Sequence, residues 1–204
     1  MAKIEKVDYG DLYTQAENIL VYGKDLNLIL ERIYLNIESM HANWYGQRYN
    51  TLLKEFNDIL PQINSLLILV VGELPFALKT IANNYSNADI GEDVKSASKE
   101  TPKDIADISI PNDVGMKFIS TDVETTRTTI SSDFGSAKEK MEKIQGVVNN
   151  LLWKSDAATT FAKKFSSIKT NIVSSFENIN SSFEKLMKQT QQDIQLAEKA
   201  NTVQ

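Results

Sequence analysis

The side chains that carry most enzyme chemistry are scarce in this sequence of 204 residues. There is no cysteine and one histidine, His41, which excludes cysteine nucleophiles, disulfides, zinc–thiolate centres and multi-histidine metal sites. Gly23-Lys24-Asp25 lacks the glycine spacing of a phosphate-binding loop. No carboxylate forms a spaced pair with a histidine or with another ligand of the kind a metal site needs. We therefore expect a protein that is not an enzyme and that uses no metal and no cofactor.

Aromatic and acidic side chains offer recognition chemistry instead. Tyr85 precedes Asp89 by four residues, a spacing that places both side chains on one face of a helix. Trp44-Tyr45-Gly46 and Trp153-Lys154-Ser155 each interrupt a helical pattern. A tyrosine, a carboxylate and a neighbouring tryptophan form a patch suited to anchoring a partner protein. The alternative is that both tryptophans fill the ends of a helix bundle while Tyr85 and Asp89 are ordinary surface residues.

Four long helical stretches must position these side chains. Apolar residues recur at alternating spacings of three and four, which is the pattern of helices packed side by side. Pro61 and Pro75 fall inside the second stretch and predict a kink or break there. Ser155 with Asp156 predicts a helix start. The four stretches are 12–44, 49–81, 119–151 and 158–194.

Residues 89–113 interrupt the helical period and predict an acidic linker between a first hairpin, 1–88, and a second, 114–204. The segment from Ala88 to Asp113 has two prolines and no sustained apolar period, and its seven acidic residues and three lysines give a net charge of −4. One short helical or extended piece is expected in it. The isoleucines at 105, 108 and 110 are candidates to dock onto the helices.

The two halves repeat, with Trp44 and Trp153 lying 109 residues apart. We therefore predict an all-α fold of two long helical hairpins that form an elongated four-helix bundle. At that offset Ile194 takes the place of Tyr85, and Glu198 that of Asp89. Further matches are Phe56 with Phe165, Ile59 with Ile168, and Ile63 with Ile172.

These motifs resemble those of the WXG superfamily, the small helical-hairpin substrates of type VII (ESX) secretion systems. The family has Trp-x-Gly in the turn, matched by Trp44 and Gly46, and Tyr-x-x-x-Asp/Glu after the second helix, matched by Tyr85 and Asp89. The resemblance implies that the latter pair is an export signal read by the membrane ATPase of the secretion machine. The second half has diverged, since Ser155 occupies the position two residues after Trp153 where the family has glycine. Ile194 and Glu198 form a weaker counterpart of the signal.

The linker length favours antiparallel packing of the two hairpins. Arms of about 40 residues are rods of roughly 60 Å. About 22 to 25 extended residues span at most roughly 70 to 85 Å, enough to climb one rod, whereas parallel packing needs only a few. The chain would then be an internal pseudo-dimer with Tyr85 and Asp89 near Trp153. Trp44 would lie near Ile194 and Glu198.

Charge and hydropathy set the remaining expectations. With 22 basic and 27 acidic residues, the net charge of −5 makes nucleic acid and anionic membranes poor partners. No N-terminal signal peptide is visible, so we expect a protein that is cytoplasmic before export and then secreted or held at the bacterial cell surface. Its partners would be the secretion ATPase and another WXG-like or toxin chain.

The run Leu66–Val71 is apolar on every side of its helix, so that the linker, a second protein or lipid must cover it. It is far shorter than the ~20 residues of a membrane-spanning helix. Two other functions therefore stay open. One is a component of an α-helical pore-forming toxin, in which this run is the concealed membrane segment. The other is a cytoplasmic coiled-coil adaptor.

Overall fold

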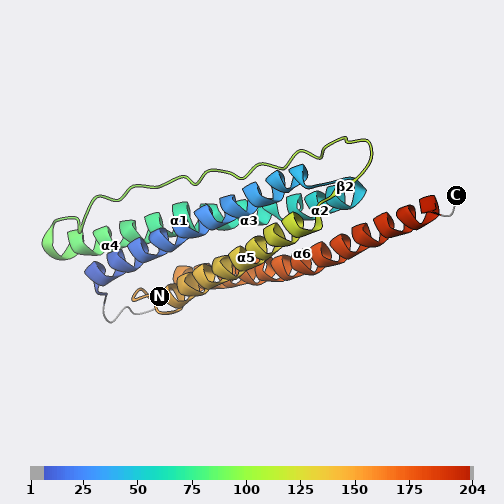
Figure 1. Ribbon diagram of the computed structural model, residues 1–204. Coiled ribbons are helices and arrows are strands. Elements are labelled where there is room, and N and C mark those ends of the chain that lie inside the picture. The colour runs from blue at the N-terminus through green and yellow to red at the C-terminus, as the bar shows by residue number, and fades with distance from the viewer. Residues whose placement is uncertain (1–6, 203–204) are drawn as a thin grey trace.

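The chain is mainly α-helical in a computed structural model that describes residues 7–202, which confirms the all-α part of the prediction. A two-stranded antiparallel sheet, β1–β2, is the only sheet in this part of the chain. The elements in chain order are α1 (Tyr9–Ser39), a 3₁₀ turn η1 (Met40–Ala42), β1 (Trp44–Tyr45), α2 (Gln47–Asn57), α3 (Leu60–Leu67), a π-helical segment η2 (Ile68–Glu73), α4 (Leu74–Ile90), β2 (Lys117–Phe118), α5 (Ser120–Asn149) and α6 (Asp156–Thr202) (Figure 1).

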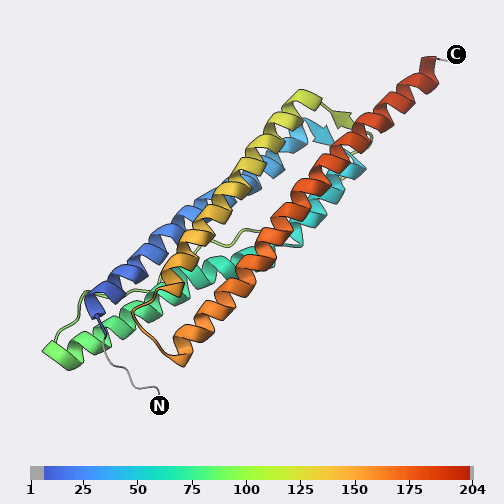
Figure 2. The ribbon, with the colours of Figure 1, turned by 90° about the horizontal axis from the view of Figure 1, so that it is seen from below.

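The helices form a long rod whose segments run back and forth along its length. After α1, the chain returns through α2, α3, η2 and α4, and residues 91–116 then travel the whole rod again to reach β2 (Figures 1 and 2). We call residues 91–116 the strap. α1 packs against α4 and α5, whereas α6 packs against α2, α3 and α5. The core is a single cluster that draws buried side chains from every α-helix.

The return from α2 to α4, which we call the second arm, is interrupted before Pro61 and distorted before Pro75, the two places where a kink or break was predicted. α2 ends at Asn57, and Pro61 lies in the first turn of α3, where its missing N–H leaves no helix bond unmade. Pro75 lies in the first turn of α4, directly after η2. A π-helical turn absorbs an extra residue, so the arm continues here without a full break.

Gly23 sits where α1 touches η2. It is a poor member of the apolar seam by side chain, and the packing explains its presence. A Cβ atom at Gly23 would lie 2.9 Å from the carbonyl oxygen of Val70, closer than real Cβ atoms approach. The missing side chain therefore allows the two backbones to meet.

The strap differs in its bounds from the predicted linker. α4 continues to Ile90, so that Asp89 belongs to a helix, and α5 begins only at Ser120. Gly91 ends α4 in the left-handed conformation with a φ of +77°, and its N–H donates to the Asn87 carbonyl. Strand β2 lies after the predicted linker, within the predicted second hairpin, and pairs Phe118 with Trp44.

The apolar run Leu66–Val71 is covered mainly by protein. All of its side chains are buried except Ile68, which is 40% exposed. The strap crosses this region so closely that a Cβ atom at Gly72 would lie 2.9 Å from the Glu100 carbonyl oxygen. Ile105 and Ile108 of the strap are buried in the core cluster, as predicted, but Ile110 is 42% exposed, so the prediction that it docks is wrong.

The helical stretch around this run is long enough to cross a membrane by length and composition. It spans Gln47–Ile90, and its most apolar 18-residue window has a mean hydropathy of 1.8. The expectation of a segment far too short was therefore wrong by this measure, because it counted only the uninterrupted run. The window is nevertheless 61% buried within the protein.

Candidate functional site

Trp44 is the centre of an aromatic cluster at one end of the rod. Its side chain has no exposed surface. The ring stacks on Phe183 of α6 with centroids 5.7 Å apart and meets Phe118 of β2 edge-on, also at 5.7 Å. Tyr49 of α2 lies 5.8 Å away. Trp44 thus connects the turn, strand β2 and helix α6. A partner protein can reach its ring only if this end of the rod opens.

Gly46 lies at the start of the second arm. It is the N-terminal cap of α2 and has a φ of +116°, a conformation that side chains disfavour. A Cβ atom there would lie 3.3 Å from the Gly115 carbonyl oxygen of the strap. Nearby, the Tyr49 hydroxyl donates to the Ile37 carbonyl at 2.9 Å, and burial raises the pKa of Tyr49 well above its ordinary value. The Trp-x-Gly motif is therefore a buried structural joint.

The C-terminal part of α6 passes this joint and continues beyond it (Figure 2). Asp193 lines a small cavity with Trp44, and its carboxylate pairs with Arg48 at 3.3 Å. Ile194 follows directly and is half-buried, and Glu198 is exposed one turn farther on. The aromatic partner of Trp44 on α6, however, is Phe183, about three turns before Ile194.

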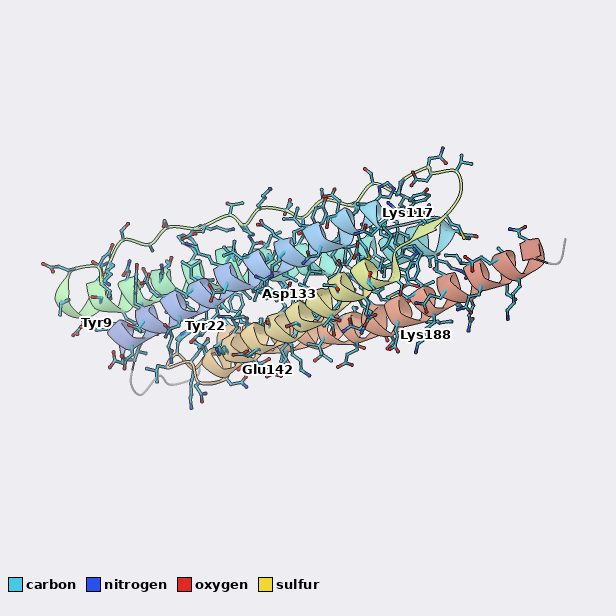
Figure 3. The ribbon with its side chains drawn as sticks, in the orientation of Figure 1. Tyr9, Tyr22, Lys117, Asp133, Glu142 and Lys188 are labelled. Carbon is cyan, nitrogen blue, oxygen red and sulfur yellow. The ribbon has the colours of Figure 1, made fainter. Side chains whose placement is uncertain are left out.

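Tyr85 and Asp89 lie in the last turns of α4, at the opposite end of the rod. Tyr85 is half-buried and Asp89 is exposed. Tyr9 lies at this end of the rod (Figure 3). The Asp89 carboxylate accepts a hydrogen bond of 3.0 Å from the Tyr9 hydroxyl, and this bond is the main cause that raises the pKa of Tyr9. Sequence patterns did not indicate Tyr9, because the contact joins residues eighty positions apart.

Trp153 is half-buried against the core in the turn between α5 and α6. Gln15 of α1 holds this turn through its side-chain amide, which donates to the Asn150 carbonyl at 3.0 Å and accepts from the Leu152 N–H at 3.1 Å. Within residues 7–202, no hydrogen bond or ring contact joins Trp153 to Tyr85 or Asp89. The aromatic side chain that contacts the carboxylate is Tyr9 instead.

The Tyr-x-x-x-acid spacing also occurs twice in α1. Tyr13 precedes Glu17, and Tyr34 precedes Glu38, by the same four residues. The hydroxyl of Tyr34 lies 3.4 Å from Glu38. The Tyr13–Glu17 pair lies near the start of α1, but Glu38, like Asp89, is followed by one more residue of its helix. Neither the spacing nor a position at a helix end is therefore specific. What distinguishes Tyr85 and Asp89 is that they end the second arm, whereas Tyr34 and Glu38 precede the turn at Trp44.

Sequence patterns also missed the residues that fasten the strap. Four asparagines of the second arm donate side-chain hydrogen bonds to backbone carbonyls of the strap: Asn50, Asn57, Asn64 and Asn83. Three of them follow each other at intervals of seven residues, which is the signal by which they could have been found. Tyr13, Lys24 and His41 add bonds from the α1 side, to Ser96, Glu100 and Asp113 respectively.

The chemistry that these sites can perform is recognition by side chains and backbone. Within residues 7–202, no group of three or more histidine, cysteine or carboxylate side chains is placed to hold a metal ion. His41 contacts Asp113 through Nε2 at 2.6 Å and so serves the strap. Comparisons with protein-family models, with curated proteins and with solved structures found no match to this chain.

Proposed function

We propose that the chain is a tandem WXG-like protein made of two helical hairpins. The first consists of α1 and the arm α2–α4, and the second of α5 and α6. Contacts of α1 with α4 and of α5 with α6 support this division. The turn at Trp44 and the turn at Trp153 lie at opposite ends of the rod, which supports an antiparallel pseudo-dimer within an elongated four-helix bundle (Figures 1 and 2).

The proposed function is non-enzymatic. A type VII secretion system exports the protein, either as a substrate or as the helical partner of a larger effector. The membrane ATPase of that system recognises Tyr85 and Asp89, and the protein passes from the cytoplasm to the outside or the cell surface. The observation that carries this proposal is the position of that pair, one turn apart at the end of the arm that follows the Trp44 turn, with the carboxylate exposed.

Export from the native bacterium tests the proposal. Tyr85→Ala and Asp89→Ala are each expected to lower the protein in the culture supernatant at least about tenfold, the loss that 1.4 kcal/mol of binding free energy gives. Supernatant and cell pellet are compared by immunoblot, with a strain that lacks the ATPase as reference. Tyr34→Ala and Glu38→Ala are the matched controls, because they remove a tyrosine and a carboxylate at the same spacing from the C-terminal end of α1, at the other end of the rod.

Thermal melts of all four variants show whether each remains folded. Tyr9→Phe adds a second control, since it removes only the intramolecular partner of Asp89 and leaves the carboxylate in place. A protein that never leaves intact cells contradicts export and favours the cytoplasmic adaptor. Export that ignores Tyr85 and Asp89 moves the signal elsewhere, first to Ile194 and Glu198 or to a partner chain.

A second candidate function is a component of an α-helical pore-forming toxin. It is favoured by the apolar window within Gln47–Ile90, which the strap and α6 cover. In that case the protein is expected to release dye from phosphatidylcholine vesicles, and Leu69→Asp is expected to abolish the release because it puts a charge into the apolar run. Absence of leakage, also after exposure to detergent, contradicts this function while export remains testable.

A further inference from the structure

Two asparagines hold the strap in the way that a neighbouring β-strand would. The side-chain amide of Asn64 donates to the Ile105 carbonyl and accepts from the Ile105 N–H, both at 3.0 Å. Asn57 makes the same pair of bonds to Ile108, both at 2.9 Å. Each amide therefore satisfies both backbone groups of one strap residue. A helical segment cannot bind in this way, because its own N–H and C=O groups are already paired.

The spacing of these two contacts fits both the helix and the extended strap. Seven residues of helix rise about 10.5 Å, and three residues of extended chain cover about 10 Å. Asparagines placed every seventh residue can thus bind every third residue of an extended chain that runs the opposite way. We call Asn64, Asn57 and Asn50 the asparagine ladder, whose third rung should meet strap residue 111.

The third rung is only half made. Asn50 donates to the carbonyl of Pro111 at 3.2 Å, but proline has no N–H to return. The side-chain oxygen of Asn50 is accordingly buried with no hydrogen-bond partner. A buried acceptor without a donor is costly. We call the surface of α1 and the second arm that the strap covers the groove. The groove thus contains an acceptor for an N–H group that the strap does not supply.

The strap presents its side chains to the groove with the same three-residue period. Pro102 and Pro111 are half-buried, Ile105 and Ile108 are buried, and most side chains between them are exposed. Among the described residues, the hydrogen bonds of the strap go to the first arm, the turn and the second arm, with none to α5 or α6. Such a period is typical of extended, polyproline-like segments bound in grooves.

We propose that this face of α1–α4 is a binding groove for an extended segment of a partner polypeptide, and that the strap occupies it in cis. The partner segment has apolar side chains at every third residue and an N–H at the third rung, where the strap has Pro111. It completes the asparagine ladder and displaces the strap. The groove goes beyond the proposed function and does not depend on export of the chain.

Competition with the strap sets the conditions for detecting such binding. A tethered segment acts at an effective concentration on the order of millimolar. A free peptide with the strap sequence therefore binds the wild-type protein hardly at all. Loosening the strap with Ile105→Asp and Ile108→Asp, which remove its two buried anchors, opens the groove in the full-length chain.

The test measures fluorescence anisotropy of labelled peptides that span residues 100–114. The native peptide is expected to bind the loosened protein, and a peptide carrying Pro111→Ala is expected to bind about two- to tenfold more tightly, the range of one added hydrogen bond. The same comparison on a loosened protein carrying Asn50→Ala is expected to show no such gain. This double-mutant cycle separates the new hydrogen bond from the greater flexibility of alanine.

Two results overturn the proposal. One is a loosened protein that keeps its helical circular dichroism, is cleaved rapidly by trypsin at the strap lysines, and binds no peptide. The other is a peptide carrying Ile105→Asp that binds as well as the native one. If the double aspartate variant does not fold, Gly72→Ala replaces it, because its Cβ atom presses on the Glu100 carbonyl and lifts the strap without adding charge. No readout involves export, so the two proposals fail separately.

Discussion

Replacing Trp44 with alanine is expected to destabilise the protein by about 3–5 kcal/mol, the range for truncating a large aromatic side chain in a core. The side chain is fully buried, and the rings of Phe183, Phe118 and Tyr49 surround it. Those rings come from three elements, two of which lie far from Trp44 in the sequence, so the cavity left by the indole is walled by separately anchored side chains. The loss therefore includes both the transfer of the indole and the unfilled volume.

Urea unfolding followed by circular dichroism measures this change. Trp153→Ala is the matched control, because Trp153 occupies the equivalent turn but is only half-buried. It is expected to cost about 1–2 kcal/mol, closer to an average substitution. Equal effects of the two substitutions would contradict the assignment of Trp44 as the buried joint of the rod. Loss of export by Trp44→Ala without loss of stability would instead make its ring a recognition residue.

The helices of this fold could be predicted from the sequence because their signal is local and repeated. Apolar residues at spacings of three and four continue over many turns, and each turn adds to the same inference. The break near Pro61 was predictable for the same reason, since a proline acts on its own helix. The start of α6 was also local, and the Ser155 hydroxyl does accept the Ala158 N–H at 3.1 Å.

Features that depend on distant contacts could not be predicted in this way. Gly23 was a weak residue in its own seam, and only the position of Val70 on another element gives it a reason. Strand β2 is two residues long and exists because it pairs with β1. The strap has a clear three-residue period, but a search for periods of two and 3.6 passes over it.

The candidate site likewise has a part that local sequence predicts and a part that depends on distant contacts. Tyr85 and Asp89 were predictable as a pair because four residues make one helical turn. Their surroundings were not, since Tyr9 reaches Asp89 only through the packing of α1 against α4. The asparagine ladder lies between these cases. Its seven-residue spacing is visible in the sequence, but its meaning depends on the strap that lies across it.

The contact between α1 and α5 joins the two halves. Two ion pairs set its register, one with the basic residue on α1 and the other with the basic residue on α5. Arg32 of α1 makes two hydrogen bonds to Asp133 of α5, at 2.8 and 2.5 Å. One heptad away on both helices, Lys140 of α5 pairs with Asp25 of α1 at 2.6 Å. Sliding one helix by a heptad would bring like charges together. The pairs therefore favour one alignment of the halves.

Arg32→Ala is expected to cost more than Asp133→Ala, although each removes the same ion pair. The Asp133 side chain is only 7% exposed, whereas that of Arg32 is 54% exposed. Without Arg32 the carboxylate remains buried with no counter-charge, at a cost of about 2–3 kcal/mol once solvent screening of the half-exposed arginine is considered. Without Asp133 the guanidinium turns to water, and the loss stays near about 1 kcal/mol.

The double variant distinguishes this asymmetry from a simple loss of contacts. Arg32→Ala with Asp133→Ala is expected to be more stable than Arg32→Ala alone, because the second substitution removes the stranded charge. Lys140→Ala is the control at the pair whose carboxylate, Asp25, is 44% exposed, and it is expected to cost less than about 1 kcal/mol. Urea midpoints of the four proteins decide the matter. Equal losses for the two single variants, or additive losses in the double variant, would show that burial of Asp133 does not govern the contact between the halves.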